Sequence, residues 1–156
     1  MSIWQTGGNK EADWNDIVDA CKSHVDQNGI IYIGCDSQVS ANKYTYVEAI
    51  CLHGANGQQG GTYFYKKENF ILERHLTMRE RITNEASRSI DLGMSLTELL
   101  PLTAKIEIHL DVSANKANAS CVLSESLSGY AKSVGFSCKL KPESWAAGCV
   151  ADVHTR

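Results

Sequence analysis

The sequence predicts a single α/β domain built on a five-stranded mixed sheet with helices on both faces. Two observations lead to this prediction. Three strand-like segments follow one another across short loops, which makes them antiparallel neighbours. Helical and strand-like segments then alternate, the pattern of crossovers between parallel strands. The chain has 156 residues, enough for one core, so we expect one domain over residues 1–156.

The first expected elements are a helix and a buried strand. Apolar residues recur at helical spacing over residues 10–27, and Asn28-Gly29 is a natural end for that helix. Residues 30–36 read Ile-Ile-Tyr-Ile-Gly-Cys-Asp, an almost wholly apolar run. Such a run is typical of a central strand that is covered on both faces. It ends at a carboxylate, Asp36.

Two more strands complete the antiparallel meander. Residues 43–52 and 62–67 are rich in β-branched and aromatic residues, and the glycine-rich segment 54–61 between them predicts a hairpin loop.

The second half alternates helices and strands. Met78, Ile82, Ala86 and Ile90 lie one helical turn apart, which predicts a helix over residues 72–91 that Gly93 ends. The remaining elements are expected as a strand at 104–111, a helix at 114–134, a strand at 135–140 and a last helix that Ser144 caps.

Composition bounds the class of protein. A net charge of −3 argues against a strongly basic nucleic-acid scaffold, but a carboxylate cluster that binds metal ions also lowers the net charge. The longest near-apolar stretch, residues 30–35, is far shorter than the ~20 residues that cross a bilayer. The first residues lack the pattern of a signal peptide, so we expect a soluble cytoplasmic protein with no membrane partner. Six scattered cysteines without a C-x-x-C pair favour buried thiols over zinc ligands.

Two aspartates each end a predicted strand. If the strands that end at Asp36 and Asp111 are parallel neighbours, both side chains emerge at the same carboxyl edge of the sheet. Ligands of open α/β sheets bind at that edge, near a switch in strand order. Two carboxylates there repel each other, and a protein tolerates this when a cation lies between them.

Two predicted helices add further carboxylates. Glu85 borders the apolar face of its helix, whereas Glu80 and Glu73 lie nearly opposite that face. Asp152 occupies the same boundary position on the last helix. Oxygen ligands from these places suit Mg²⁺ or Mn²⁺ better than zinc.

Four segments carry a resemblance to a known family. They are Ile-Gly-Cys-Asp-Ser-Gln at 33–38, Asn-Glu-Ala-Ser-Arg-Ser-Ile at 84–90, Ile-His-Leu-Asp-Val-Ser at 108–113 and Lys-Pro-Glu-Ser-Trp-Ala-Ala-Gly-Cys-Val-Ala-Asp at 141–152. In this order they resemble the YkuK-like branch of the ribonuclease H-like superfamily, over roughly residues 10–156. The resemblance implies the strand order 3-2-1-4-5 with the second strand antiparallel.

The resemblance also implies a nuclease. Asp36, Glu85, Asp111 and Asp152 match four acidic residues that hold two divalent ions, Mg²⁺ or Mn²⁺, in active members of the superfamily. Such ions lie about 3.5–4 Å apart, activate a water and steady the leaving 3′ oxygen. His154 is expected to assist proton transfer or product departure, although it departs from the position of the loop histidine in the best-known bacterial ribonuclease H. The expected substrate is RNA or an RNA–DNA hybrid, with DNA also open.

Alternatives stay open at this point. The chain is also compatible with a nonenzymatic nucleic-acid-binding module or with a junction-resolving or transposase-type enzyme on DNA, which usually needs a dimer and a basic surface. Four tyrosines fit base stacking, but cross-strand packing is the preferred interpretation. They are Tyr44, Tyr46, Tyr63 and Tyr65. Five lysines fit phosphate contacts and solvated strand edges equally well: Lys43, Lys66, Lys67, Lys139 and Lys141.

Overall fold

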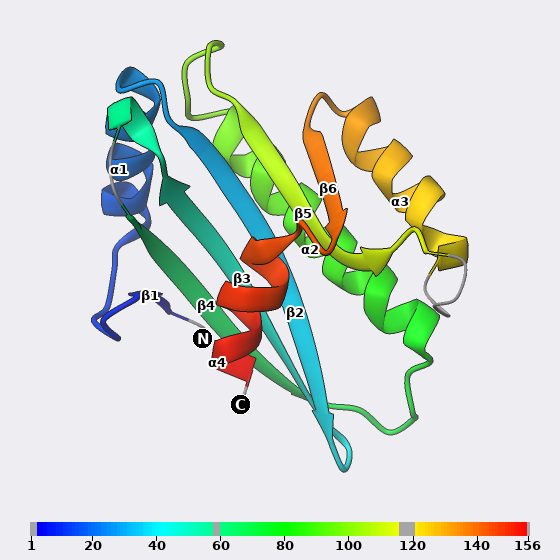
Figure 1. Ribbon diagram of the computed structural model, residues 1–156. Coiled ribbons are helices and arrows are strands. Elements are labelled where there is room, and N and C mark those ends of the chain that lie inside the picture. The colour runs from blue at the N-terminus through cyan, green and yellow to red at the C-terminus, as the bar shows by residue number, and fades with distance from the viewer. Residues whose placement is uncertain (1–2, 58–59, 116–120, 156) are drawn as a thin grey trace.

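Six strands form one mixed sheet in the computed structural model, which describes residues 3–57, 60–115 and 121–155 (Figure 1). The strand order across the sheet is β1-β4-β3-β2-β5-β6. The strands are β1 Trp4–Thr6, β2 Ile30–Ser40, β3 Lys43–His53, β4 Gly61–Ile71, β5 Ile106–Ser113 and β6 Ser137–Lys141. Neighbours from β1 to β2 are antiparallel, whereas β5 runs parallel to both β2 and β6.

The expected count of five strands is wrong because of β1. This three-residue strand pairs antiparallel with β4 at the edge of the sheet, with Gln5 opposite Tyr65. The other five strands follow one another as β4-β3-β2-β5-β6, so the sheet differs from the expected order by the added edge strand.

Helices cover both faces of the sheet (Figure 1). On one face lie α1 Trp14–Asp26, α2 Met78–Thr97 and α3 Cys121–Ser133, and on the other lie the π-helix η2 Ala146–Ala151 and the short α4 Asp152–Thr155. The main core lies between the first three helices and the sheet, and it includes Ile17, Ile33 and Ile90. A smaller core lies under η2, around Val47 and Ala146. No helix in the described ranges is long and apolar enough to cross a membrane.

The helix α2 begins and ends later than the sequence predicts. Thr77 caps its first turn, and Thr77 and Glu80 form a reciprocal capping box, which explains the start at Met78. Gly93 lies inside the helix instead of ending it. A side chain at Gly93 would meet the Phe136 ring at 3.0 Å, so the glycine allows close packing of α2 against the start of β6. The predicted helix 114–134 is α3, and residues 116–120 of that prediction lie outside the described residues.

Three of the four tyrosines pack in the core, as the sequence predicts, and Tyr63 is half-buried. Tyr44, Tyr46 and Tyr65 are buried, and the Tyr44 hydroxyl accepts a hydrogen bond from the backbone of Leu76 at 2.7 Å. These rings therefore belong to the core and not to an exposed stacking surface.

Candidate active site

The strands β2 and β5 separate next to two aspartates. Their last paired residues are Gly34 and His109, so Asp36 and Asp111 each lie two residues beyond the last pair. The expectation that the first strand ends at Asp36 is wrong, because β2 stays paired with β3 as far as Ser40. Alternation along the strands places Asp36 and Asp111 on the same face as Gly34, the face that η2 covers.

Gly34 lets η2 lie directly on the sheet. A methyl group at Gly34 would lie 2.4 Å from the backbone nitrogen of Ala147 and 2.5 Å from the carbonyl carbon of Ala146. Only hydrogen fits between these two backbones. The fully buried Ala146, Ala147 and Ala151 keep η2 close to the sheet, and α4 continues from its end with Asp152 as the first residue.

His109 fastens the start of η2 to β5. Its Nδ1 accepts a hydrogen bond from the backbone N–H of Ala146 at 3.0 Å, and its Nε2 lies 2.8 Å from Glu107 Oε1. An accepting Nδ1 requires the proton on Nε2, which then donates to Glu107. Burial lowers the pKa of His109, so the neutral ring is favoured. The ring is wholly buried beside Trp145, with centroids 5.1 Å apart.

Asp36 lies at the centre of four carboxyl groups, which we call the carboxylate cluster: Asp36, Glu85, Asp111 and Asp152. Its side chain is 7% exposed and shares a hydrogen bond with the Asp152 side chain. Burial, this bond and the charges of the other three carboxylates raise the pKa of Asp36 from 3.8 to about 8. The structure therefore places the other three carboxyl groups within electrostatic reach of Asp36, and their role as a metal site stays a prediction.

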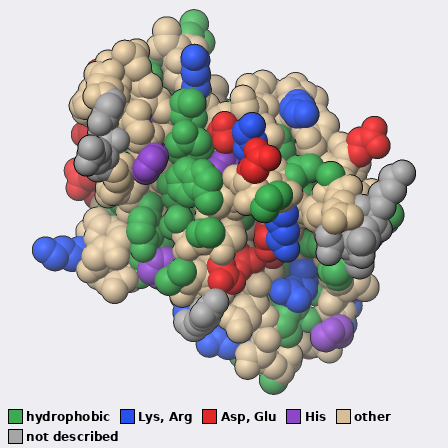
Figure 2. Space-filling view, viewed as in Figure 1, with side chains coloured by type: hydrophobic (Ala, Val, Ile, Leu, Met, Phe, Trp, Pro, Cys, Tyr) green, Lys and Arg blue, Asp and Glu red, His purple; other side chains and the backbone are tan. Residues whose placement is uncertain are grey.

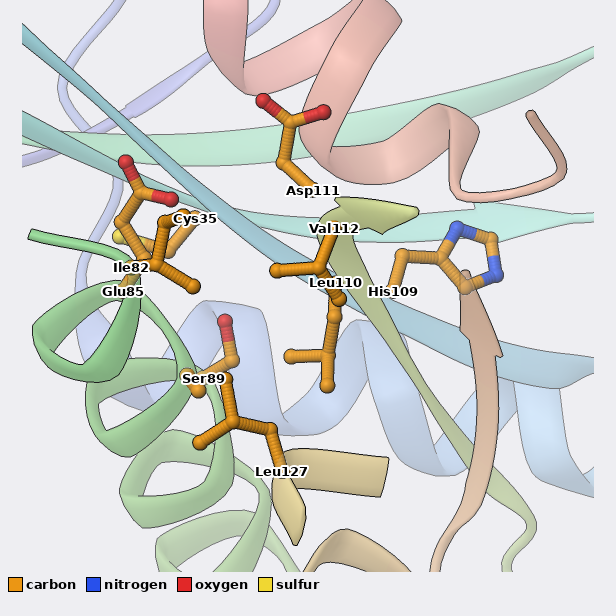
Figure 3. Close-up of a pocket in the computed structure, with 10 residues that line it drawn as sticks. Cys35, Ile82, Glu85, Ser89, His109, Leu110, Asp111, Val112 and Leu127 are labelled. Atoms are coloured by element: carbon orange, nitrogen blue, oxygen red, sulfur yellow. The ribbon is translucent and has the colours of Figure 1, made fainter. Parts of the chain in front are cut away.

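Glu85 reaches the cluster from α2 and is held by Ser37. The Ser37 hydroxyl donates to Glu85 Oε1 at 2.5 Å, and Arg81 donates to the Ser37 carbonyl at 3.1 Å. Burial raises the pKa of Glu85 to about 7, opposed by the Ser37 hydrogen bond and reinforced by the charge of Asp111. Figure 3 shows the Glu85 and Asp111 carboxylates both pointing away from Leu127 of α3.

Asp111 is paired with a lysine of the neighbouring strand. Lys141 Nζ lies 3.2 Å from Asp111 Oδ1, and Lys141 ends β6 opposite Ser113 of β5. Figure 2 shows acidic side chains gathered beside basic ones on the face that carries α4. Opposite charges therefore meet at the edge of the carboxylate cluster.

His154 lies against β4, and its expected catalytic role stays a prediction. Its Nε2 shares a hydrogen bond of 2.7 Å with the Tyr63 hydroxyl, and its ring stacks on Tyr65 with centroids 3.7 Å apart. These contacts follow from the direction in which α4 leaves η2, which turns Asp152 toward β2 and His154 toward β4. The geometry indicates that His154 anchors α4.

Three members of the carboxylate cluster each have a side-chain partner within the protein. Asp36 has Asp152, Glu85 has Ser37 and Asp111 has Lys141. Within the described ranges, no three His, Cys, Asp or Glu side chains are arranged so that they could hold a metal ion. The donor chemistry nevertheless fits Mg²⁺ or Mn²⁺, because four carboxylates supply hard oxygen ligands.

Sequence patterns missed two residues of the site, Ser37 and Arg81, and did not single out a third, Lys141. Ser37 follows Asp36 directly, and Arg81 precedes Glu85 by one helical turn, so proximity along the chain could have indicated both. Lys141 was one of five lysines without a distinguishing pattern, because its place beside Asp111 depends on the register of β6 against β5.

Comparisons with known proteins agree with the fold. A family model described as "Ribonuclease H-like" matches residues 14–156. The chain is 26% identical over 162 residues to the "Uncharacterized protein YkuK" of Bacillus subtilis (strain 168). The alignment covers 92% of this chain and 91% of that protein. No solved structure matches this chain.

Proposed function

This chain belongs to the ribonuclease H-like family, and from that premise we propose that it is a divalent-metal-dependent nuclease that hydrolyses phosphodiester bonds in RNA or RNA–DNA hybrids. The reaction would take place at the carboxylate cluster. One observation carries the proposal: Asp36 lies in a hydrogen bond with Asp152 and within the electrostatic reach of Glu85 and Asp111.

A structural role does not explain this arrangement well. Burying carboxylates together destabilises the folded state when they are ionised, and the raised pKa values of Asp36 and Glu85 have this same cause. Strongly perturbed carboxyl groups that converge on one sheet edge are typical of functional sites. The edge in question lies where β2 and β5 separate, which is the usual ligand position in α/β sheets.

The chain's own residues would supply the ligands of the ions and orient them. Asp36 and Asp111 present oxygen ligands from neighbouring strands, and Asp152 adds a third carboxylate from the first turn of α4, on the face of the sheet that the two strand residues share. Ser37 orients Glu85, with Arg81 bound to the Ser37 carbonyl behind it. Mg²⁺ or Mn²⁺ ions bound there supply an activated water and neutralise charge on the attacking and leaving oxygens.

The packing of η2 fixes where Asp152 stands. Gly34 lets the backbone of η2 approach β2, and the buried His109 ring holds the first residue of η2. Positioning within fractions of an ångström matters for ion binding, and rigid buried elements provide it. His154 would serve the same purpose through Tyr63 and Tyr65, as an anchor of α4 and not as a proton carrier.

A cleavage panel tests the proposal. Labelled single strands, duplexes, RNA–DNA hybrids and junctions are incubated with the full chain and Mg²⁺, Mn²⁺ or EDTA. We expect metal-dependent cleavage of RNA or the hybrid and none in EDTA. Cleavage of junctions alone would indicate a junction-resolving enzyme on DNA. Binding without cleavage under every condition would indicate a nonenzymatic nucleic-acid-binding module and would contradict the proposal.

A further inference from the structure

Lys141 presents a positive charge at the mouth of the carboxylate cluster. Its ammonium lies 3.2 Å from Asp111 Oδ1, and its side chain is 51% exposed, against 23% for that of Asp111. An ammonium group has three hydrogen-bond donors. The described contact with Asp111 uses one of them, so the amine can reach a second partner from solvent without leaving β6.

We propose that Lys141 binds a phosphate of the nucleic acid substrate beside the carboxylate cluster. This inference rests on the proposed nuclease function and adds to it the residue that receives the substrate's charge. A cluster of four carboxylates repels a polyanion, so a substrate phosphate needs positive charge from the protein at this edge. Lysine is a compact point charge well suited to phosphate.

Asp111 and a substrate phosphate compete for the Lys141 ammonium. Without metal, the ammonium neutralises Asp111. A divalent cation that binds Asp111 Oδ1 competes with the ammonium for the same oxygen and leaves it available for phosphate. Removing the Lys141 charge therefore has two effects of opposite sign: stronger binding of the metal and weaker binding of the nucleic acid. A purely structural lysine would produce neither effect.

Lys139 is the matched control. It lies on the same strand two residues earlier, so its side chain emerges on the same face, and it is 47% exposed. It pairs in register with His109 and forms an ion pair with Glu143 at 3.9 Å, away from Asp111. Lys139→Gln removes the same charge from the same strand but leaves the cluster untouched.

Two measurements compare Lys141→Gln with Lys139→Gln and with the wild-type chain. The first is the Mn²⁺ concentration that gives half of the full rise in melting temperature, without nucleic acid. Lys141→Gln should lower it about twofold to fivefold, the size expected from losing a partly exposed ion pair. The second is the affinity for a fluorescently labelled RNA–DNA hybrid in Ca²⁺ at several salt concentrations. Lys141→Gln should weaken binding several-fold and reduce the slope of log K against log salt by about 0.7–0.9, the loss of one phosphate contact.

The outcomes separate this inference from the proposed function. Lys141→Arg should restore the salt slope, since it keeps the charge. If Lys141→Gln and Lys139→Gln behave alike in both measurements, or if Lys141→Gln weakens Mn²⁺ binding, the inference is overturned while metal-dependent cleavage by the wild-type chain can still stand. If the wild-type chain binds the hybrid but never cleaves it, a slope change specific to Lys141→Gln upholds the phosphate contact and the nuclease proposal fails. A wild-type chain that does not bind the hybrid overturns the inference.

Discussion

Asp36 and Asp152 share a side-chain hydrogen bond, although one belongs to the first long strand of the sheet and the other to the last helix. Two carboxyl groups form such a bond only when one of them holds a proton. With the pKa of Asp36 raised to about 8, the metal-free protein keeps this proton near neutral pH. A proton and the Lys141 ammonium therefore compensate, in the metal-free protein, the charge that divalent ions would compensate in a nuclease.

The stability of the metal-free protein should fall as the pH rises from about 4 to about 8. The pKa values of Asp36, about 8, and of Glu85, about 7, lie above their ordinary values of 3.8 and 4.5. The folded state thus binds more protons than the unfolded state within this window. The stabilisation is complete below the unfolded pKa values and is lost as the pH passes through the folded ones.

Melting temperatures in EDTA across this pH range, for the wild-type chain and for Asp36→Asn, check the prediction. The difference between the two proteins removes the contribution of unrelated groups. Asp36→Asn should show a flatter dependence. A wild-type chain that loses no stability relative to Asp36→Asn as the pH rises would show that folding does not raise the pKa of Asp36.

Asp36→Asn should stabilise the metal-free protein at pH 8. The substitution keeps size and shape, removes a buried charge and ends its repulsion with Glu85 and Asp111. We expect a gain of about 1–3 kcal/mol in the free energy of unfolding. Asp111→Asn should gain less, because it also loses the ion pair with Lys141.

Glu80→Gln is the control for that experiment. Glu80 lies at the first turn of α2, where it pairs with the exposed Arg74 and caps Thr77, away from the cluster. Glutamine can keep the capping contact, so Glu80→Gln should change stability far less than Asp36→Asn does. Unfolding of the Asp36→Asn protein would assign Asp36 a structural role.

Much of this arrangement follows from local patterns. The meander of β2, β3 and β4 and the two parallel crossovers depend on run lengths, short loops and the handedness of crossovers, all of which are readable along the chain. Alternation in β2 and β5 places Asp36 and Asp111 on one face of the sheet, and the helical period of α2 places Glu85 at the border of the apolar face of that helix. These rules lead to Asp36, Asp111 and Glu85 without knowledge of the tertiary contacts.

The missed features depend on contacts between distant segments. The edge strand β1 has three residues, too few for a periodic signal, and it exists because β4 offers a free edge. The π-helix η2 lies over Gly34 and is held by the His109 ring, and both contacts join distant segments of the chain. The direction of His154 depends on that turn, and a position two residues after Asp152 could not reveal it.

His154→Ala should act on stability. The substitution removes a hydrogen bond to Tyr63 and a ring stacked on Tyr65, which together should cost about 1–2 kcal/mol. Cleavage per folded molecule should remain within about threefold of the wild-type rate, far from the 10²–10⁴-fold loss typical of an acid–base group. Denaturant unfolding and single-turnover cleavage measure the two effects. A fully stable variant without activity would return His154 to the catalytic role that the sequence suggests.

Gly34→Ala should displace η2 and with it Asp152. The new methyl group would lie 2.4 Å from the Ala147 nitrogen, so backbone has to move, at a cost of about 1–3 kcal/mol. Cleavage should fall as well, since Asp152 begins the helix that follows η2. Gly129→Ala is the control: it lies in α3, and its new methyl group would meet nothing within 4 Å. That variant should gain about 0.5–1 kcal/mol. Equal stability of the two variants would contradict the close approach of η2 and β2.

The most direct test of the central claim is single-turnover cleavage by Asp36→Asn and by the wild-type chain at saturating Mn²⁺, on the substrate that the cleavage panel identifies. Asparagine cannot supply the anionic ligand, so the rate should fall by at least about a hundredfold while the metal-free fold stays intact. Glu80→Gln should cut at the wild-type rate. An Asp36→Asn protein that cleaves as fast as the wild-type chain would show that the carboxylate cluster is not the active site.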